Sequence, residues 1–207
     1  MKILSALALT IAVAIGHAQS FEGVIRYDVS SKSPGAFSIG IEHVATLKLK
    51  GGSIYTVLKS KREGQLETVY LAGENKSYQI DHIRQRYVIM PKQPAAAEVK
   101  VNATSDTKKI LGHRCTKYVS EKTDGASFTF WVTKDLADID CKSINENLSF
   151  IPCTQLGGIP LMIDTVAPNG SYTLTVIEIK PQQLPGWLFE LNKDYTIEEA
   201  PLRRVDH

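Results

Sequence analysis

The sequence predicts a mainly β fold, in which about nine or ten short strands follow one another as an antiparallel meander. Apolar and polar residues alternate over residues 39–50, the period of two expected of a half-buried strand. Strand-like segments follow one another at short spacing, divided by Gly and Asn turns, as in an antiparallel meander. Asp124-Gly125 and Asn169-Gly170 are hairpin turn sequences. So many strands with so little helix exceed one flat sheet, so the sheet must curl or split.

The expected strands follow these turns along the chain. They cover residues 21–30, 39–50, 53–61, 65–72, 76–82, 84–90, 114–121, 126–134, 159–166 and 171–180, and residues 99–105 are a further candidate. Pro91 and Pro94 disfavour a central strand, so residues 91–98 are expected to form a loop or one helical turn. Within residues 138–160, the part 144–150 is a candidate short helix. These two segments are the only candidates for a cover over the sheet.

The first residues predict export. A basic start, Met1-Lys2, precedes an apolar run over 3–15 and small residues at Gly16 and Ala18. This is the pattern of a secretory signal peptide, residues 1–18, cleaved after Ala18. The run is too short for a membrane anchor, and no later segment predicts a stable membrane span. No cysteine lies near the cleavage point, so we expect a periplasmic or secreted protein whose residues 19–207 form a single domain.

The balance of charge argues against a nucleic-acid partner. The net charge is +2, and Lys2 in the predicted signal peptide contributes to it. A nearly neutral domain offers no electrostatic footprint for nucleic acid.

Three cysteines, Cys115, Cys141 and Cys153, remain in the predicted exported domain. An oxidising compartment makes one disulfide plausible. Cys141 and Cys153 are close in sequence and are the favoured pair. Cys115 could pair with either, or be a small buried hydrophobe within a strand.

No catalytic or metal-binding pattern stands out. His113 and Cys115 lie two apart on a predicted strand, and Asp138, Asp140 and Cys141 add potential ligands, but no CxxC, HExxH or calcium-loop spacing occurs. There is no G-x-S-x-G elbow, and Cys115 would be a nucleophile only with a base beside it. His43 is expected to be a hydrogen-bonded core histidine. We therefore predict no catalytic residue, no metal, no cofactor and no enzymatic activity.

Residues 108–136 carry a recognisable pattern. It consists of Ile110, Gly112, Cys115, Lys117, Tyr118, Trp131, Val132, Thr133, Asp135 and Leu136. This pattern resembles a signature of the DUF4412 family of exported bacterial proteins, and the tail LFELNKDYTIEEAPL resembles that family's "LFE…Y" ending. The family is similar to the LolA-like group of periplasmic lipoprotein carriers. The resemblance implies a strongly curved antiparallel sheet, an incomplete barrel, whose apolar concave face has a short helical or loop cover.

The apolar faces of the strands are the candidate binding site. We expect an apolar ligand, such as a lipid or a lipoprotein acyl chain, to contact Leu47, Leu49, Phe128, Phe130, Leu161, Met162, Ile163 and Leu174. The alternative is that these side chains pack into an ordinary core. In that case the protein would be an interaction module for another cell-envelope protein, without a ligand.

Overall fold

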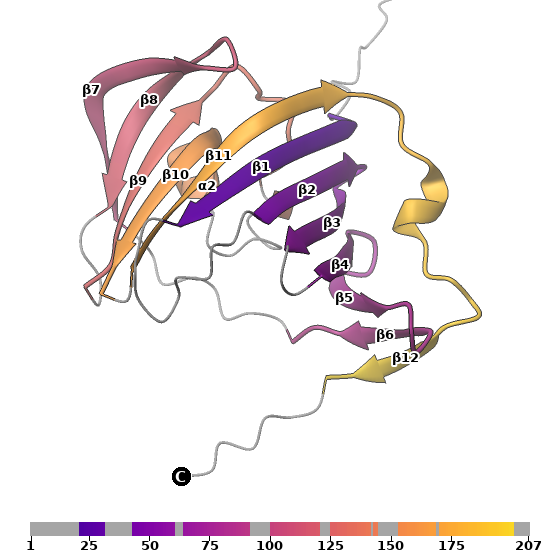
Figure 1. Ribbon diagram of the computed structural model, residues 1–207. Coiled ribbons are helices and arrows are strands. Elements are labelled where there is room, and N and C mark those ends of the chain that lie inside the picture. The colour runs from indigo at the N-terminus through magenta and orange to yellow at the C-terminus, as the bar shows by residue number, and fades with distance from the viewer. Residues whose placement is uncertain are drawn as a thin grey trace, which may run out of the picture.

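The computed structural model describes residues 21–31, 43–60, 64–91, 100–120, 125–141, 143–144, 153–168 and 170–200. In these residues twelve strands form one sheet, in the order β12-β6-β5-β4-β3-β2-β1-β11-β10-β9-β8-β7. The strands are β1 (Gly23–Ser31), β2 (His43–Lys50), β3 (Ser53–Ser60), β4 (Gly64–Leu71), β5 (Lys76–Asp81), β6 (Arg86–Ile89), β7 (Val101–Ile110), β8 (His113–Ser120), β9 (Ser127–Thr133), β10 (Ile159–Ala167), β11 (Gly170–Pro181) and β12 (Thr196–Glu199). The sheet is curved and not closed (Figure 1), which confirms the predicted mainly β fold.

The strand pairing follows the predicted meander closely. Successive strands from β1 to β6 and from β7 to β11 are neighbours in the sheet, and every pair among them is antiparallel, including the central β1–β11 pair. β9 and β10 are neighbours too, but a long segment, residues 134–158, connects them. β12 is the exception, because it adds in parallel to the edge strand β6. The last strand that the sequence analysis expected ends at residue 180, so β12, whose four residues are all exposed, was not predicted.

The larger core lies on one face of the sheet, which we call the inner face. Alternate residues of the central strands point to it and are almost fully buried, as Ile25, Leu47, Phe130 and Ile163 show. The register explains their meeting, because Ile25 pairs with Leu47 and Phe130 with Ile163. The alternation predicted for residues 45–49 is therefore confirmed by burial of Ala45, Leu47 and Leu49.

The cover of the inner face comes from the segment between β9 and β10. Ile139, Ile144 and Leu156 are buried in the same cluster as the sheet residues. Leu156 belongs to the one-turn helix α2 (Cys153–Leu156), which lies behind β10 and β11 in the view of Figure 1. The prediction that residues 138–160 provide a thin cover is thus confirmed for its described part. The other expected cover, residues 92–98, lies outside the described residues, as do residues 1–20 with the predicted signal peptide.

A second, smaller core lies on the opposite face, which we call the outer face. It contains Tyr55, Val57, Val69, Leu71, Tyr78, Tyr87 and Leu188. All but Leu188 come from β3 to β6. Leu188 belongs to the 3₁₀ helix η1 (Gly186–Phe189), part of a C-terminal segment, residues 184–195, that crosses this face before β12.

β3 is the strand where the apolar side of the sheet changes. Ile54 is buried in the inner cluster, whereas its neighbours Tyr55 and Val57 are buried in the outer one. Beyond it, the inner face becomes polar, where Arg86 pairs with Asp81 at 3.3 Å and with Glu198. A single sheet therefore supports two separate apolar layers, one on each face.

Candidate functional site

The predicted ligand-binding residues divide into two groups in the structure. Six of them form the floor of the inner cluster and are at most 6% exposed: Leu47, Leu49, Phe130, Leu161, Ile163 and Leu174. They pack against the sheet's own cover, as a core does.

The remaining two residues lie elsewhere. Phe128 is half-buried at the edge of the inner cluster, and its ring stacks on that of Phe130 with 6.0 Å between centroids. Met162 points away from the inner face, because it alternates with Leu161 and Ile163, which are both buried in the inner cluster. Its sulfur accepts a hydrogen bond from Lys108, whose Nζ also lies 4.0 Å from the centre of the Trp131 ring. Leu161, Met162 and Ile163 therefore do not share one surface.

The inner face continues past its cover as an open apolar end. Tyr27, Ala45, Leu58 and Leu66 are successive cross-strand neighbours on β1 to β4. Exposure rises along this row from 2% at Tyr27 and 9% at Ala45 to 38% at Leu58 and 40% at Leu66. We call Leu58 and Leu66 the open inner end. Phe128 and Tyr172 are further half-buried or exposed side chains on the same face, but they belong to β9 and β11, several strands away.

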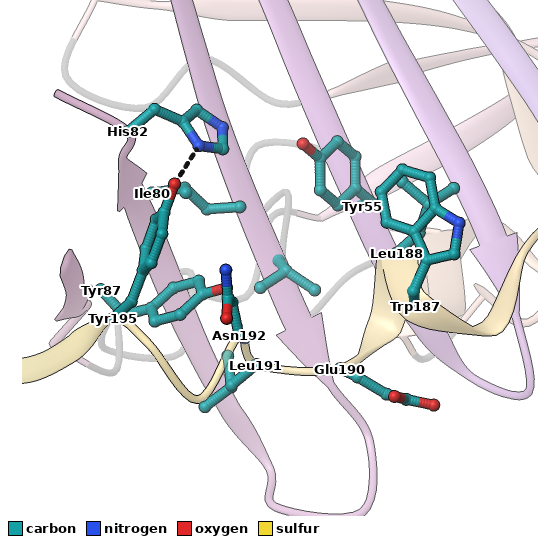
Figure 2. Close-up of a pocket in the computed structure, with 11 residues that line it drawn as sticks. Tyr55, Ile80, His82, Tyr87, Trp187, Leu188, Glu190, Leu191, Asn192 and Tyr195 are labelled. Atoms are coloured by element: carbon teal, nitrogen blue, oxygen red, sulfur yellow. Dashed lines mark hydrogen bonds between the residues drawn. The ribbon is translucent and has the colours of Figure 1, made fainter. Parts of the chain in front are cut away.

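A second candidate is a cavity of about 360 Å³ on the outer face, which we call the outer cavity. It lies between β3–β6 and the C-terminal segment (Figure 2). The sheet and the turn after β5 contribute Tyr55, Val69, Ile80, His82 and Tyr87, and the segment contributes Trp187, Leu188, Glu190, Leu191, Asn192 and Tyr195. The volume is within the range of pockets for small molecules, about 300–1,000 Å³.

Hydrogen bonds hold the segment over this cavity. His82 Nδ1 lies 3.0 Å from the Tyr195 hydroxyl, and its Nε2 lies 3.5 Å from a Glu67 carboxylate oxygen. The backbone N–H of Asn192 donates to the Tyr87 hydroxyl at 2.9 Å. The contacts tie strands β4 and β6 and the turn after β5 to a segment more than 100 residues later, so the cavity has fixed walls on both sides.

The start of the C-terminal segment is anchored by one carboxylate. Glu22 accepts hydrogen bonds from the Leu184 backbone N–H and from Lys50 Nζ, the latter at 3.0 Å. Lys50 also donates to the Leu184 carbonyl at 2.6 Å. The backbone hydrogen bond from Leu184, followed by Lys50, lowers the pKa of Glu22, so the anchor is ionised at neutral pH.

The residues considered for catalysis make structural contacts and do not form a catalytic group. Cys115 is fully buried, and its thiol donates to the backbone carbonyl of His113 at 3.7 Å, not to the imidazole. Burial raises the pKa of Cys115, which is the opposite of an activated thiolate. The His113 ring instead lies 3.6 Å from Asp135. Because thiol and imidazole do not meet, this group does not form a nucleophile and base.

The structure corrects the prediction of a disulfide. Neither Cys115 nor Cys141 forms a disulfide in the structure, so the favoured Cys141–Cys153 pair and the Cys115 alternatives are not present. The Cys141 thiol donates to the Gly158 carbonyl at 3.5 Å. Cys153 begins α2, but its side chain is outside the described part. Cys141 and Cys153 are close in sequence, but this does not bring about a disulfide, because the Cys141 thiol is directed to the Gly158 carbonyl.

The candidate metal ligands make other contacts, Asp140 through its side chain and Asp138 through its backbone carbonyl. The Asp140 carboxylate accepts from the Ser143 hydroxyl at 2.6 Å and from the Ser143 backbone N–H at 3.3 Å, as an N-cap does. The Asp138 carbonyl accepts from the Phe21 N–H at 2.9 Å. In the described residues no group of three metal-binding side chains comes together. His43 belongs to β2, and its side chain is outside the described part.

The sequence matches the family described as "Domain of unknown function (DUF4412)" over residues 40–195. The chain belongs to this family. The match includes the signature hairpin β8–β9 and most of the C-terminal segment, so both the inner and the outer layer are parts of the DUF4412 domain. No curated protein matches the sequence.

Solved structures resemble this DUF4412 protein at low sequence identity. An uncharacterized conserved protein from Thermus thermophilus is 14% identical with a TM-score of 0.53, and the match covers 86% of this chain and 91% of that one. Mycobacterium tuberculosis lipoprotein LppX is 11% identical with a TM-score of 0.37, covering 79% and 90%. The Pseudomonas aeruginosa MucA/MucB complex gives 11% and 0.45, covering 86% and 58%. The Thermus similarity establishes a common fold.

The outer cavity was missed by the sequence analysis, although a signal for it was present. The "LFE…Y" ending was treated only as a mark of the family. In the structure, Leu188, Glu190 and Tyr195 of that ending line the outer cavity, and Phe189 packs against the outer core. An aromatic-rich segment after the last predicted strand, with no strand alternation of its own, is the feature that could have located this site.

Proposed function

We propose that this DUF4412 protein is an exported, non-enzymatic protein that binds an apolar ligand, such as a lipid or a lipoprotein acyl chain, on the inner face of its curved sheet. One observation carries the proposal: the apolar inner face extends past its cover to the open inner end. Monomeric proteins place few large apolar side chains together in solvent, and such patches commonly mark binding surfaces. The predicted signal peptide and the resemblance to lipoprotein carriers support export and an apolar cargo.

In the part of the chain that the structure describes, no helix has the length and apolarity to span a membrane. The proposed ligand approaches the open inner end from solvent, with Leu58 and Leu66 as the first contacts and the buried Ala45 and Tyr27 next along the same cross-strand row.

The test compares three variants of the mature protein in a fluorescent fatty-acid binding assay. Leu58→Asp and Leu66→Asp place a charge on the open inner end, where both side chains already reach solvent, so the fold should persist. Ile177→Asp is the matched control, because Ile177 is 43% exposed and belongs to neither core cluster. We expect binding to fall at least about tenfold for the first two variants, since a charge must then be desolvated, and to be unchanged for the control.

Absence of fatty-acid binding by the unmodified protein, or equal binding by all three variants, would contradict the proposal. The same open inner end could instead contact another cell-envelope protein. That alternative predicts a stoichiometric protein, and no lipid, in native mass spectra of the exported protein, and Leu58→Asp would abolish the association.

A further inference from the structure

The outer cavity has aromatic walls and polar edges. Tyr55 and Trp187 lie on one side of it, and His82, Asn192 and Tyr195 lie on the other (Figure 2). Trp187 is 70% exposed, although it belongs to the same short helix as the buried Leu188. The helix thus uses one side chain to hold the segment down and presents the other at the cavity, where a flat ligand could stack.

An acyl chain does not suit these walls. His82, Asn192 and Tyr195, which carry polar side chains, are among the residues that line the cavity. A purely apolar ligand would cover these groups without hydrogen bonding to them, which is costly. The outer cavity therefore differs in chemistry from the open inner end.

A quaternary ammonium ion does not suit them either. Such a cation needs several open ring faces around one point. Here the Tyr87 and Tyr195 rings lie 5.3 Å apart, centre to centre, and cover each other. Lys48 Nζ already lies 5.0 Å from the centre of the Tyr55 ring. The available rings do not form an empty cage.

The charges around the cavity favour a neutral ligand. The Glu190 carboxylate points away from the cavity (Figure 2), Lys48 lies against the ring of Tyr55, and the Glu67 carboxylate is directed to His82. Charges of both signs thus lie near the cavity, so it has no strong field of one sign to select an anion or a cation. A ligand with one apolar face and hydrogen-bonding edges uses both the aromatic walls and the polar rim.

We infer that the outer cavity is a binding site for a neutral saccharide ring, with Trp187 stacking on its C–H face and the Asn192 amide and the Tyr195 hydroxyl meeting its hydroxyl groups. A pyranose ring has this combination of an apolar face and a polar edge, and a cavity of about 360 Å³ accommodates one or two rings. The site is on the opposite face from the proposed apolar ligand and does not depend on it.

Tryptophan fluorescence provides a direct test, because the sequence has only two tryptophans. Trp131 is on β9 between Lys108 and Lys117, away from the outer cavity. In a Trp131→Phe variant the emission therefore reports on Trp187 alone. The probes are glucose, N-acetylglucosamine, N-acetylglucosamine disaccharide and lactose, with choline and decanoate as cationic and apolar comparators.

We expect at least one saccharide to change the Trp187 emission with a dissociation constant of about 1–10 mM, the range that ligand efficiency allows for one ring. Choline and decanoate should leave that emission unchanged. A response to a comparator alone, or no response to any saccharide, would overturn the inference.

A second measurement tests sugar binding without relying on Trp187 fluorescence. Saturation-transfer NMR on the sugar itself should show binding to fall at least about tenfold in Trp187→Ala and to persist in Trp131→Phe. Because Trp187 is mostly exposed, the alanine variant should fold, and an unchanged circular dichroism spectrum checks this. Equal sugar binding by Trp187→Ala and the unmodified protein would also overturn the inference, whereas fatty-acid binding by these variants reports separately on the inner face.

Discussion

The two faces of this sheet use apolar side chains in different ways. On the inner face, a local segment between neighbouring strands β9 and β10 fills the centre, and Ile139, Ile144 and Leu156 complete a packed core. On the outer face, a segment from the far end of the chain crosses β3–β6, is fastened by Leu188 and leaves a cavity beside it. The comparison shows that burial at the centre of a curved sheet does not by itself identify a binding site, and that the margins of a cover are better places to look.

The largest expected effect comes from emptying the inner core. Phe130→Ala removes a side chain that is 1% exposed at the centre of the larger cluster, so we expect the free energy of unfolding to fall by about 3–5 kcal/mol. Urea denaturation followed by circular dichroism measures the change. A loss below about 1 kcal/mol would mean that the inner face is loosely filled and would weaken the contrast between the faces.

A smaller and more local effect is expected on the outer face. Leu188→Ala should cost about 2 kcal/mol, the low end for such a truncation, because the segment can detach while the sheet remains folded. Hydrogen exchange should accelerate at residues 184–199 and stay unchanged in β1, β10 and β11. Acceleration throughout the sheet would show that the outer layer is not an independent unit.

The smallest effect should depend on pH. Glu22→Gln weakens the anchor at Leu184, and the folded-state pKa of Glu22 lies below its ordinary value of 4.5. A depressed pKa contributes stability that is present above about pH 4.5 and is lost as pH falls through the folded-state value. The variant should therefore be less stable than the unmodified protein at pH 7, and the difference should shrink toward about pH 3 in urea titrations. A difference that grows in acid would contradict the role given to this carboxylate.

Much of the fold followed from the sequence because alternation reports one-sided burial. Leu47 and Leu49 were placed correctly on the inner face for this reason. β3 was recognised as a strand, but its two-sided burial, with Ile54 inward and Tyr55 outward, gave no sign that the apolar face changes there. Leu161, Met162 and Ile163 were grouped because the run is strongly apolar, although alternation along β10 puts Met162 on the face opposite to Leu161 and Ile163.

Local sequence patterns could not predict the outer cavity or β12. β12 pairs Ile197 with Tyr87, and Tyr195 meets His82, although more than 100 residues separate these partners. Such contacts depend on where the chain returns after the sheet has formed, which neither alternation nor turn sequences specify. The open inner end was missed for a related reason, because Leu58 and Leu66 resemble buried strand leucines until the extent of the cover is known.

The most direct test of the account is a methyl NMR titration of leucine- and isoleucine-labelled protein with decanoate. The account predicts chemical-shift changes at Leu58 and Leu66 on the open inner end, with Ile80, Leu188 and Leu191 at the outer cavity unaffected. Changes confined to the outer-cavity methyl groups, with none at Leu58 and Leu66, would contradict the assignment of the apolar ligand to the inner face.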